Sequence, residues 1–477
     1  MKRPNVVFIL IDDMGWMDIS CQGSSFYETP NIDRLAAEGM RFTDAYASCP
    51  VCSPTRASIM SGKYPARIGL TNYIGGPEHC KLGGELGKLL SAPYVPFLST
   101  EEMSMASAFK RNGYATWHLG KWHLGRENYW PDKHGFDLNL GGCHMGHPSG
   151  KGHYFPPWEI PTLEQREGDG YLTDRFGDEA ARLIRESDGT PFFMNMWFYS
   201  VHTPVQAKPE KIAKYEQKAR DLGLDKVDAI VEGDFFPAEH KMRHRIQRRV
   251  VQSDPVYAAM IESLDENVGK ILDALDTKGI ADDTIVIFTS DNGGLSTAEG
   301  SSTCNAPLLE GKGWMYEGGV REPMLLRWPA KVAAGCQTDA VITSPDFYPT
   351  LLEACGLPLV PEQHVDGTSF LPVLEGSPFE RGSVFWHFPH YANQGGCPGC
   401  SIRNGDWKLI ALFEGELELY NLKDDIGETR NLAERHPEKV QSLLAELHAW
   451  QDEVNAINPV ANADWKPWRD ADLNPLD

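Results

Sequence analysis

The sequence predicts an α/β protein in which a large, mostly parallel sheet is sandwiched by helices, followed by a smaller C-terminal α+β subdomain. Short apolar runs alternate with helical patterns along most of the chain, which is typical of a layered sheet with helices on its faces. After about residue 375, short alternating strands follow one another without helices between them. The length of 477 residues also exceeds what one small core needs. We therefore predict two domains, at residues 1–375 and 376–477.

The strands of the first domain are predicted from apolar runs. These are NVVFILI (5–11), YATWHL (114–119), PFFMNMWFYS (191–200), TIVIFTS (284–290) and PMLLRW (323–328). Ahead of the fourth run, apolar residues recur at helical spacing at Val256, Met260, Leu264, Val268, Ile271 and Leu275. Gly279 is placed to cap this helix before the next strand begins.

The second domain is predicted to hold an antiparallel sheet and a final helix. Its strands are SVFWHF (383–388), WKLIALF (407–413) and LELYNL (417–422). The helix starts at Pro437, and its apolar face is formed by Val440, Leu443, Leu444, Leu447 and Trp450. The Gly- and His-rich segments 141–158 and 387–407 are predicted to be loops.

Charge and hydropathy exclude several classes of partner. The chain has 45 Lys and Arg against 67 Asp and Glu, a net charge of −22, which argues against nucleic acid and anionic membranes as partners but allows a local basic pocket. No stretch is long enough to span a membrane. The first apolar run meets Asp12 after seven residues and lacks a cleavage site, so it makes a poor signal peptide. We expect a cytoplasmic protein, or an exported one whose signal has been removed.

The cysteines allow two interpretations of the segment CSPTR. Ten cysteines are too sparse for a disulfide scaffold, but Cys49 and Cys52, like Cys397 and Cys400, have CxxC spacing. One interpretation is therefore that the chain is a redox or zinc protein, although the two pairs lie far apart in the sequence. Alternatively, with Pro54 in a first helical turn, Cys52 lies at a helix N-terminus, which favours an anion and lowers the pKa of a thiol.

Three polar clusters directly follow predicted strands. They are Asp12-Asp13, Lys121-Trp122-His123 and Asp291-Asn292. Because ligands bind at the carboxyl ends of strands in open α/β sheets, these clusters are expected to converge. Their oxygen ligands suit Ca²⁺ or Mg²⁺. The alternative is that each acidic pair only caps a helix or turns the chain.

Several motifs together resemble one family. CSPTRASIMSG (52–62) resembles the signature of the type I sulfatases of the alkaline-phosphatase-like superfamily, in which CxPxR directs oxidation of the cysteine to formylglycine. Similar motifs follow the family's order: NVVFILIDDMGW, TPNIDRLAAEG, HLGKWHLG, TIVIFTSDNGG and EGKGWMYEGGVREP. The resemblance runs from residue 4 to about residue 330, with Ser61 where the signature usually has Thr. It implies that residues 1–375 form a catalytic sulfatase domain.

The resemblance also implies residue roles. Cys52 becomes the formylglycine precursor, made by a formylglycine-generating enzyme, and Arg56 supports it electrostatically. The implied Ca²⁺ ligands, with Mg²⁺ as the alternative, are Asp12, Asp13, Asp291, Asn292 and an oxygen of the modified residue 52. Lys121 and Lys312 would hold the sulfate oxygens, His123 would serve residue 52, and His202 would face the leaving-group oxygen.

The chemistry of a sulfate monoester explains these residue types. The ester is anionic and repels nucleophiles, so a metal and two lysines are needed to neutralise its oxygens. A hydrated aldehyde offers one hydroxyl to attack sulfur and a second whose deprotonation later releases sulfate. We hypothesise that Asp291 accepts the first proton, His202 protonates the leaving oxygen and His123 deprotonates the second hydroxyl.

The sequence allows more than one substrate class and two alternative functions. The chain resembles bacterial carbohydrate sulfatases, with galacto-configured sugar sulfates favoured and an aryl or steroid sulfate as the alternative. A phosphatase or phosphodiesterase of the same fold would use Ser or Thr and two transition metals, and a non-catalytic binding protein would need no acid and base. Specificity is expected in segments 71–100, 141–158 and 387–407, with His387, His390 and Arg403 as candidate contacts.

Overall fold

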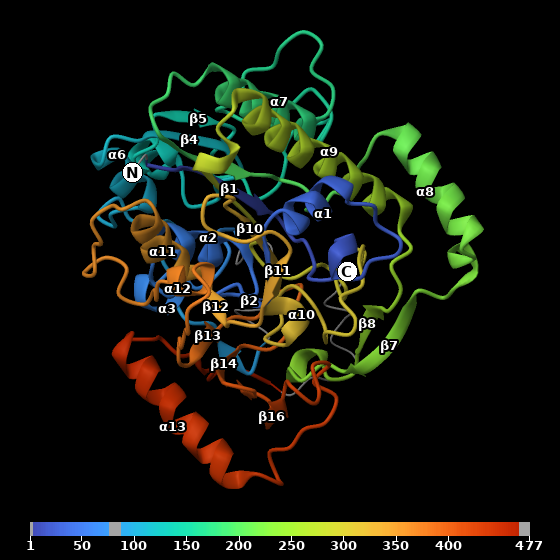
Figure 1. Ribbon diagram of the computed structural model, residues 1–477. Helices are drawn as coiled ribbons and strands as arrows, with labels where there is room; N and C mark the ends of the chain where they lie inside the picture. Colours follow the sequence, from blue (N-terminus) through green and yellow to red (C-terminus); the bar gives the residue numbers. More distant parts are fainter. Residues whose placement is uncertain (1–2, 76–86, 467–477) are drawn as a thin grey trace.

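A nine-stranded sheet forms the centre of the molecule, which is a computed structural model that describes residues 3–75 and 87–466 (Figure 1). Its strands are β1 (Asn5–Ile11), β2 (Met40–Tyr46), β4 (Ala115–Gly120), β5 (Leu138–Leu140), β6 (Phe192–Trp197), β9 (Thr284–Ser290), β10 (Arg321–Arg327), β11 (Cys336–Thr338) and β12 (Ile342–Thr343). Their order is β11-β2-β10-β9-β1-β6-β4-β5, with β12 also beside β2. Among the strands described, β10 alone runs against its neighbours, so the sheet is mostly parallel as predicted.

Helices cover both faces of this sheet, which explains why its central strands are apolar throughout. In β1, Val7 and Ile9 belong to one hydrophobic cluster, whereas Phe8 and Leu10 belong to another on the opposite face. The first cluster includes residues of α1 (Pro30–Ala37), α7 (Leu172–Glu186), α8 (Pro209–Asp221) and α9 (Pro255–Lys278). The second includes residues of α2 (Cys52–Ser61), α6 (Met105–Arg111), α11 (Phe347–Ala354) and α12 (Leu371–Leu374).

The helix predicted ahead of the fourth strand is α9, and its ends follow from local chemistry. The Asp254 side chain accepts hydrogen bonds from the backbone N–H groups of Val256 and Tyr257, which caps the helix start. Gly279 ends the helix with φ 73°, a left-handed conformation that glycine adopts without steric cost. The chain then enters β9 through a single 3₁₀ turn.

The C-terminal part holds a four-stranded antiparallel sheet, in the order β13-β14-β15-β16, against which α13 packs. These elements are β13 (Val384–Phe388), β14 (Gly399–Asn404), β15 (Trp407–Leu412), β16 (Leu417–Asn421) and α13 (Pro437–Glu453). The prediction that 387–407 is entirely a loop is wrong, because Gly399–Asn404 forms a strand. The segment GCSIRN has a low strand propensity of its own, but its backbone pairs with β13 on one side and β15 on the other.

Buried ion pairs join this sheet to the large one. Lys408 on β15 lies 2.8 Å from Glu317 and 3.0 Å from Glu428, and all three side chains are fully buried. Arg403 on β14 lies 2.6 Å from Asp44 of β2. Glu317 begins the short helix α10 (Glu317–Val320), which follows the loop that carries Lys312. The C-terminal sheet therefore supports one wall of the region described below.

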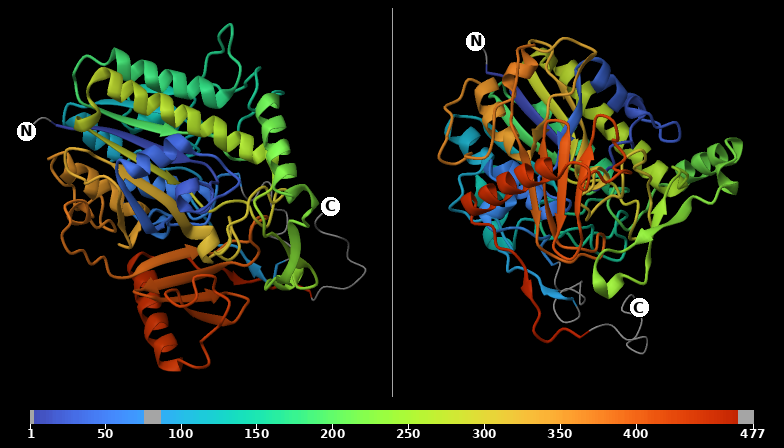
Figure 2. Two further views of the ribbon diagram at one scale, coloured as in Figure 1. Left: turned by 45° about the vertical axis from the view of Figure 1, so that its right-hand side comes forward. Right: turned by 90° about the horizontal axis from the view of Figure 1, so that it is seen from below.

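Smaller elements complete the structure. A hairpin of β7 (Ile230–Phe235) and β8 (Arg245–Arg249) projects beside α8 (Figure 2), and β3 (Leu89–Leu90) pairs with β17 (Val460–Ala461). Within residues 3–75 and 87–466, the remaining helix is α3 (Pro65–Ile68). The 3₁₀ turns of the same residues are η1 (Ser20–Gln22), η2 (Glu127–Tyr129), η3 (Pro131–His134), η4 (Leu224–Lys226), η5 (Glu239–Lys241), η6 (Ala281–Asp283) and η7 (Ser344–Asp346). Across the part of the chain that is described, no helix has the length and apolar character needed to cross a membrane.

Candidate active site

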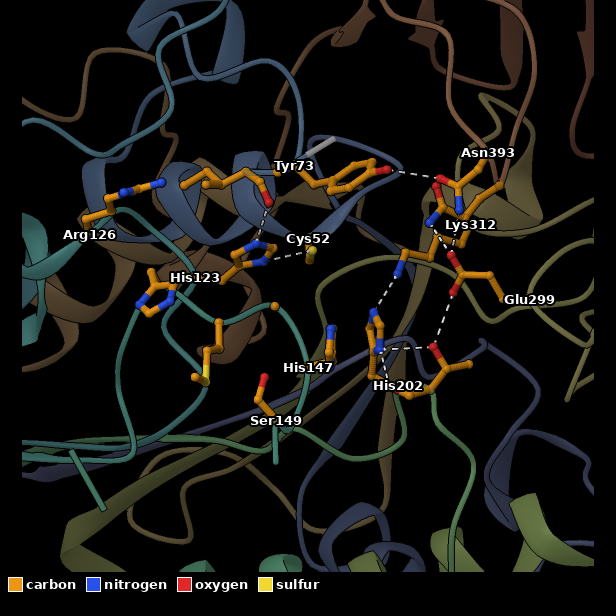
Figure 3. Close-up of a pocket in the computed structure, with 17 residues that line it drawn as sticks. Cys52, Tyr73, His123, Arg126, His147, Ser149, His202, Glu299, Lys312 and Asn393 are labelled. Carbon is orange, nitrogen blue, oxygen red and sulfur yellow. Dashed lines mark hydrogen bonds between the residues drawn. The ribbon is translucent and has the colours of Figure 1, made fainter. Parts of the chain in front are cut away.

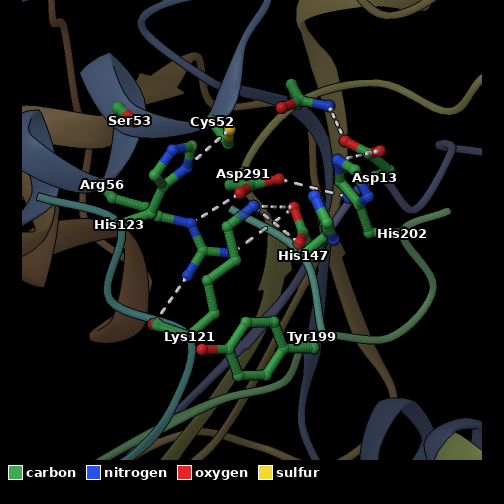
Figure 4. A network of polar contacts seen from close by, with 12 residues as sticks. Asp13, Cys52, Ser53, Arg56, Lys121, His123, His147, Tyr199, His202 and Asp291 are labelled. Carbon is green, nitrogen blue, oxygen red and sulfur yellow. Dashed lines mark hydrogen bonds and ion pairs between the residues drawn. The ribbon is translucent and has the colours of Figure 1, made fainter. Parts of the chain in front are cut away.

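The carboxyl ends of three strands and the start of one helix meet at one edge of the large sheet (Figure 4). Asp12 and Asp13 follow β1, Asp291 follows β9, and α2 begins at Cys52. Asp13 adopts φ 63° and His123, after β4, adopts φ 58°. A left-handed backbone is uncommon in residues other than glycine and persists only where its surroundings hold it, so this edge is a candidate functional site.

Each of three buried carboxylates faces a buried cation. The pairs are Lys121 Nζ with Asp12 Oδ2 at 2.7 Å, Lys312 Nζ with Asp13 Oδ1 at 2.8 Å, and Arg56 Nε with Asp291 Oδ2 at 2.7 Å. Burial alone would raise the pKa of Asp13, but Lys312 and His202 hold it well below its usual range. Burial raises the pKa of Asp12, although the charge of Lys121 opposes the shift. Each carboxyl group thus has a cationic partner, which lets these groups be buried together.

The same cluster fits a hard cation. Ligand atoms of Asp12, Cys52 and Asp291 lie within 4.8 Å of one another, as do those of Asp12, Asp13 and His202. The Nδ2 group of Asn292 donates to Asp13 Oδ1 at 2.8 Å, which leaves its Oδ1 atom buried without a hydrogen-bond partner in the described structure. A buried orphan oxygen beside three carboxylates is a donor set suited to Ca²⁺ or Mg²⁺.

The two CxxC pairs form no disulfide and no thiolate metal site among the described residues. Among the cysteines that the structure describes, none forms a disulfide. Within the same residues, Cys52 is the only cysteine in a group of close metal-ligand side chains, and its companions there are carboxylates. The described residues therefore do not support the alternative interpretation as a zinc or redox protein.

Cys52 lies at the first position of α2, as predicted, and faces a histidine. Its Sγ atom is 3.3 Å from His123 Nδ1, while His123 Nε2 lies 2.9 Å from the carbonyl of Ile74. Because a carbonyl only accepts, Nε2 carries the proton and Nδ1 is left to accept one from residue 52. The prediction that the helix end lowers the thiol pKa is wrong: Cys52 is only 3% exposed, and burial raises its pKa against the opposing effect of Lys121.

His202 and Lys312 form a second pair. His202 Nδ1 donates to the carbonyl of Thr203 at 2.7 Å, and its Nε2 atom faces Lys312 Nζ at 3.2 Å. Burial, together with the charge of Lys312, lowers the pKa of His202 to about 3. The imidazole is therefore neutral at pH 7, with Nε2 accepting a hydrogen bond from the lysine.

A cavity of about 540 Å³ opens above these groups (Figure 3). Among the predicted site residues, Cys52, His123, His202 and Lys312 line it. The others, Asp12, Asp13, Arg56, Lys121, Asp291 and Asn292, are buried and do not line it. The predicted residues therefore divide into a reactive surface and a charged layer that contacts it.

Most of the remaining cavity wall comes from segments 71–100, 141–158 and 387–407, where specificity was expected, but Glu299 lies outside them. Glu299 accepts from Asn393 Nδ2 at 2.9 Å and from Gln394 Nε2 at 2.6 Å. Burial favours the neutral form of this carboxyl, but Lys312 and His202 lower its pKa overall. Glu299 lies in STAEGSS, which carries no motif. Arg126 and Thr203 also lie outside the predicted segments. The lining residues inside those segments, none of them named individually beforehand, are Tyr73, Ile74, Gly75, His144, Met145, Gly146, His147, Ser149, Asn393 and Gln394.

The three candidate specificity residues of the C-terminal part do not line the cavity. Arg403 pairs with Asp44, as described above, and His387 Nε2 donates to the carbonyl of Ile457 at 3.0 Å. His390 Nε2 lies 2.8 Å from Thr71 Oγ1 and is 1% exposed. All three stabilise the fold around the C-terminal sheet, whereas the neighbouring Asn393 and Gln394 reach the cavity.

Known families and proteins resemble this chain over most of its length. A family described as Sulfatase matches residues 4–357, and a second, described as N-sulphoglucosamine sulphohydrolase, C-terminal, matches residues 309–455. A protein named Sulfatase from Formosa agariphila is 32% identical over 95% of this chain and 90% of its own length. The N-acetylgalactosamine-6-sulfatase of Homo sapiens is 31% identical over 81% of this chain and 68% of its own.

A solved structure agrees with these relatives. The crystal structure of Ps i-CgsB in complex with k-i-k-neocarrahexaose is 28% identical in sequence and has a TM-score of 0.74. The match covers 94% of this chain and 92% of that protein. The likeness extends through the C-terminal sheet as well as the large one, since so little of either chain is left out.

Proposed function

The chain belongs to the sulfatase family and is a sulfatase, and on that premise we propose that it releases sulfate from sulfated carbohydrates, with galacto-configured sugars as the favoured substrates. One observation carries the proposal. Cys52 lies in a cavity beside His123, His202 and Lys312, and buried carboxylates lie behind it. This arrangement offers a reactive side chain, proton carriers and positive charge at one place.

The polarity of the cavity supports a sugar over an aryl or steroid sulfate. Glu299, Asn393, Gln394 and Ser149 present carboxylate, amide and hydroxyl groups to the interior. Such groups form hydrogen bonds with sugar hydroxyls, whereas an apolar steroid would leave them without partners. The name of the human relative, an N-acetylgalactosamine-6-sulfatase, supports the galacto-configured choice.

We propose that the buried acidic cluster holds Ca²⁺, with Mg²⁺ as the alternative. Asp12, Asp13, Asp291 and Asn292 would supply oxygens, together with an oxygen of the modified residue 52. A bound divalent cation polarises sulfate oxygens as a Lewis acid. Because each of the three carboxyl groups already faces a cation of the chain, a bound metal ion would add positive charge to the site, which favours an anionic ester.

We further propose that Cys52 is converted to formylglycine, whose hydrate supplies a hydroxyl nucleophile. His123 is positioned to take a proton from residue 52, because Nδ1 faces it and Nε2 is fixed by Ile74. On the opposite side, Lys312 donates to His202 Nε2, so this pair can pass a proton to the leaving oxygen. Lys121 orients Asp12 through two short hydrogen bonds.

Mass spectrometry and a substrate panel test the proposal together. The peptide that contains Cys52 should show the mass loss expected when a thiol becomes an aldehyde, in protein made by a host with the maturing enzyme. Sulfate release should be greater from galactose 6-sulfate than from nitrophenyl sulfate and should vanish in Cys52→Ala. Faster turnover of nitrophenyl phosphate, retained in Cys52→Ala, would instead identify a phosphatase of this fold.

A further inference from the structure

One segment of this acidic protein is strongly basic. Residues 240–249, HKMRHRIQRR, contain five Lys or Arg residues and no acidic residue, in a chain whose net charge is −22. The segment ends in β8 and forms one side of the β7–β8 hairpin. A local concentration of positive charge on an acidic protein is a candidate binding surface for an anion.

The hairpin encloses a second cavity of about 600 Å³. Cationic, imidazole and aromatic side chains line it: Lys241, Arg243, His244, Arg245, Phe235 and Phe236. Glu232, Gln247, Thr297 and Ala298 contribute as well. Arginine guanidinium groups match the oxygens of a sulfate ester, and aromatic rings pack against the apolar faces of sugars.

Not every base of the segment faces this cavity. Arg248 pairs with the buried Glu310, and Arg249 donates to the carbonyl of Ser301 and to Ser253 Oγ. These two arginines therefore fix the hairpin to the rest of the molecule. Lys241, Arg243 and Arg245 of the same segment lie on the cavity wall.

Arg243 and Arg245 are the bases best placed for a ligand. Both are exposed, and the Arg245 guanidinium lies 4.2 Å over the ring of Phe235. Its carboxylate neighbour, Glu232, is 4.0 Å away and largely exposed, so that ion pair contributes little. Stacking on the ring, together with a hydrogen bond of 2.9 Å from Arg245 Nη1 to the carbonyl of Gly233, holds the guanidinium in place at the cavity wall.

The second cavity adjoins the catalytic one. Glu299 and Asn393 line both, so a ligand in one cavity can continue into the other. Because Glu299 lines both cavities, it lies at their junction, where its carboxylate repels an anionic group and accepts hydrogen bonds from hydroxyls. Anionic groups therefore fit on either side of the junction, with an uncharged part of the ligand between them.

We propose that the hairpin cavity is a second anion subsite, which binds another sulfate group of the same saccharide chain while the scissile sulfate occupies the catalytic cavity. This inference rests on the proposed sulfatase activity toward sugars. It makes the preferred substrate a sulfated oligosaccharide carrying at least two sulfates, with free hydroxyls on the part that passes Glu299. The attraction is electrostatic and partly exposed, so added salt weakens it.

Kinetics of an Arg243→Gln/Arg245→Gln variant test this subsite. The substrates are sulfated hexasaccharides of carrageenan and of chondroitin 6-sulfate, compared with galactose 6-sulfate. In the wild type, kcat/KM is greater for at least one hexasaccharide, and its KM rises with added NaCl. In the variant, the ratio of hexasaccharide to monosaccharide kcat/KM falls about tenfold, mainly through KM, as expected for loss of two partly exposed charged contacts. The salt dependence of KM flattens at the same time.

A matched control is Arg435→Gln, which removes an exposed arginine just ahead of α13 and should leave the ratio at its wild-type value. Should the double variant not fold, each single substitution is expected to lower the ratio about threefold, half of the tenfold loss on a logarithmic scale. A ratio unchanged in folded variants, or a wild type with no preference for either hexasaccharide, overturns the subsite. A wild type that releases no sulfate from any ester overturns the proposed function itself.

Discussion

Replacing Lys408 by Met should destabilise the protein strongly, because the lysine is the cation that faces the buried carboxylate of Glu317 and the buried carboxyl group of Glu428. Its Nζ atom lies 2.8 Å from Glu317 and 3.0 Å from Glu428, and none of the three side chains is exposed. Removing one partner of a buried ion pair costs about 3–5 kcal/mol of unfolding free energy. Glu317 keeps Arg321 at 3.1 Å, so we expect a loss near the lower end, about 3 kcal/mol.

The pH dependence of this loss follows from the two carboxyl groups. Despite burial, Lys408 and Arg321 hold the pKa of Glu317 at about 2, so its stabilising contribution is present above its unfolded pKa and is lost only in strong acid. Burial raises the pKa of Glu428 to about 8 although Lys408 opposes the shift, so stability falls as pH rises toward that value. Without Lys408 both groups take up protons more readily, and the deficit of the variant should shrink at about pH 5 and grow at about pH 8.

Urea unfolding followed by tryptophan fluorescence at both pH values measures the deficit. Lys408→Met/Glu317→Gln/Glu428→Gln is the control, because it also removes the uncompensated carboxylates and should recover at least half of the loss. A deficit below about 1 kcal/mol, or one that is the same at both pH values, would refute the argument that an uncompensated buried charge sets the cost.

Three further predictions concern the cavity. Chelation by EDTA should lower sulfate release at least about tenfold, and added Ca²⁺ should restore it. The Asn292→Ala variant should need about tenfold more Ca²⁺, because an oxygen ligand is lost. Activity that does not change with EDTA would contradict a metal at this cluster. A Cβ atom at Gly146 would lie 2.6 Å from His123 Cε1, so Gly146→Ala should displace the imidazole and lower kcat about tenfold. A Cβ atom at Gly170 meets nothing within 4 Å, so the control variant Gly170→Ala should leave kcat unchanged. Glu299→Gln should lower kcat/KM for galactose 6-sulfate relative to nitrophenyl sulfate about tenfold, because an amide is a weaker acceptor for sugar hydroxyls; equal losses on both substrates would show a structural role instead.

The sequence predicted the parts of the fold whose signal is local. The runs that became β1, β6 and β9 are apolar because both of their faces are covered, and α9 carries its own cap and stop at Asp254 and Gly279. The strand β14 could not be predicted in this way. Its residues favour turns, and it exists because β13 and β15 lie on either side of it.

The residues of the candidate site likewise divide into those with a local sequence signal and those that only tertiary packing brings together. Asp12, Asp13, Asp291 and Cys52 were identifiable because each follows a strand or starts a helix within a motif. Glu299 was not, since its place in the wall depends on Asn393 and Gln394, which lie more than ninety positions further along the chain. Loop side chains meet through tertiary packing, which leaves no periodic trace in the sequence.

The burial of α2 limits when the proposed conversion of Cys52 can take place. All ten residues from Cys52 to Ser61 are buried, including Pro54 and Arg56 of the CSPTR segment. A modifying enzyme that recognises these residues can reach them only before the helix packs against its neighbours. Conversion of Cys52 would then compete with folding, and a molecule that folds first would keep its thiol permanently. The yield of active protein would be decided during synthesis, by which of the two processes is faster.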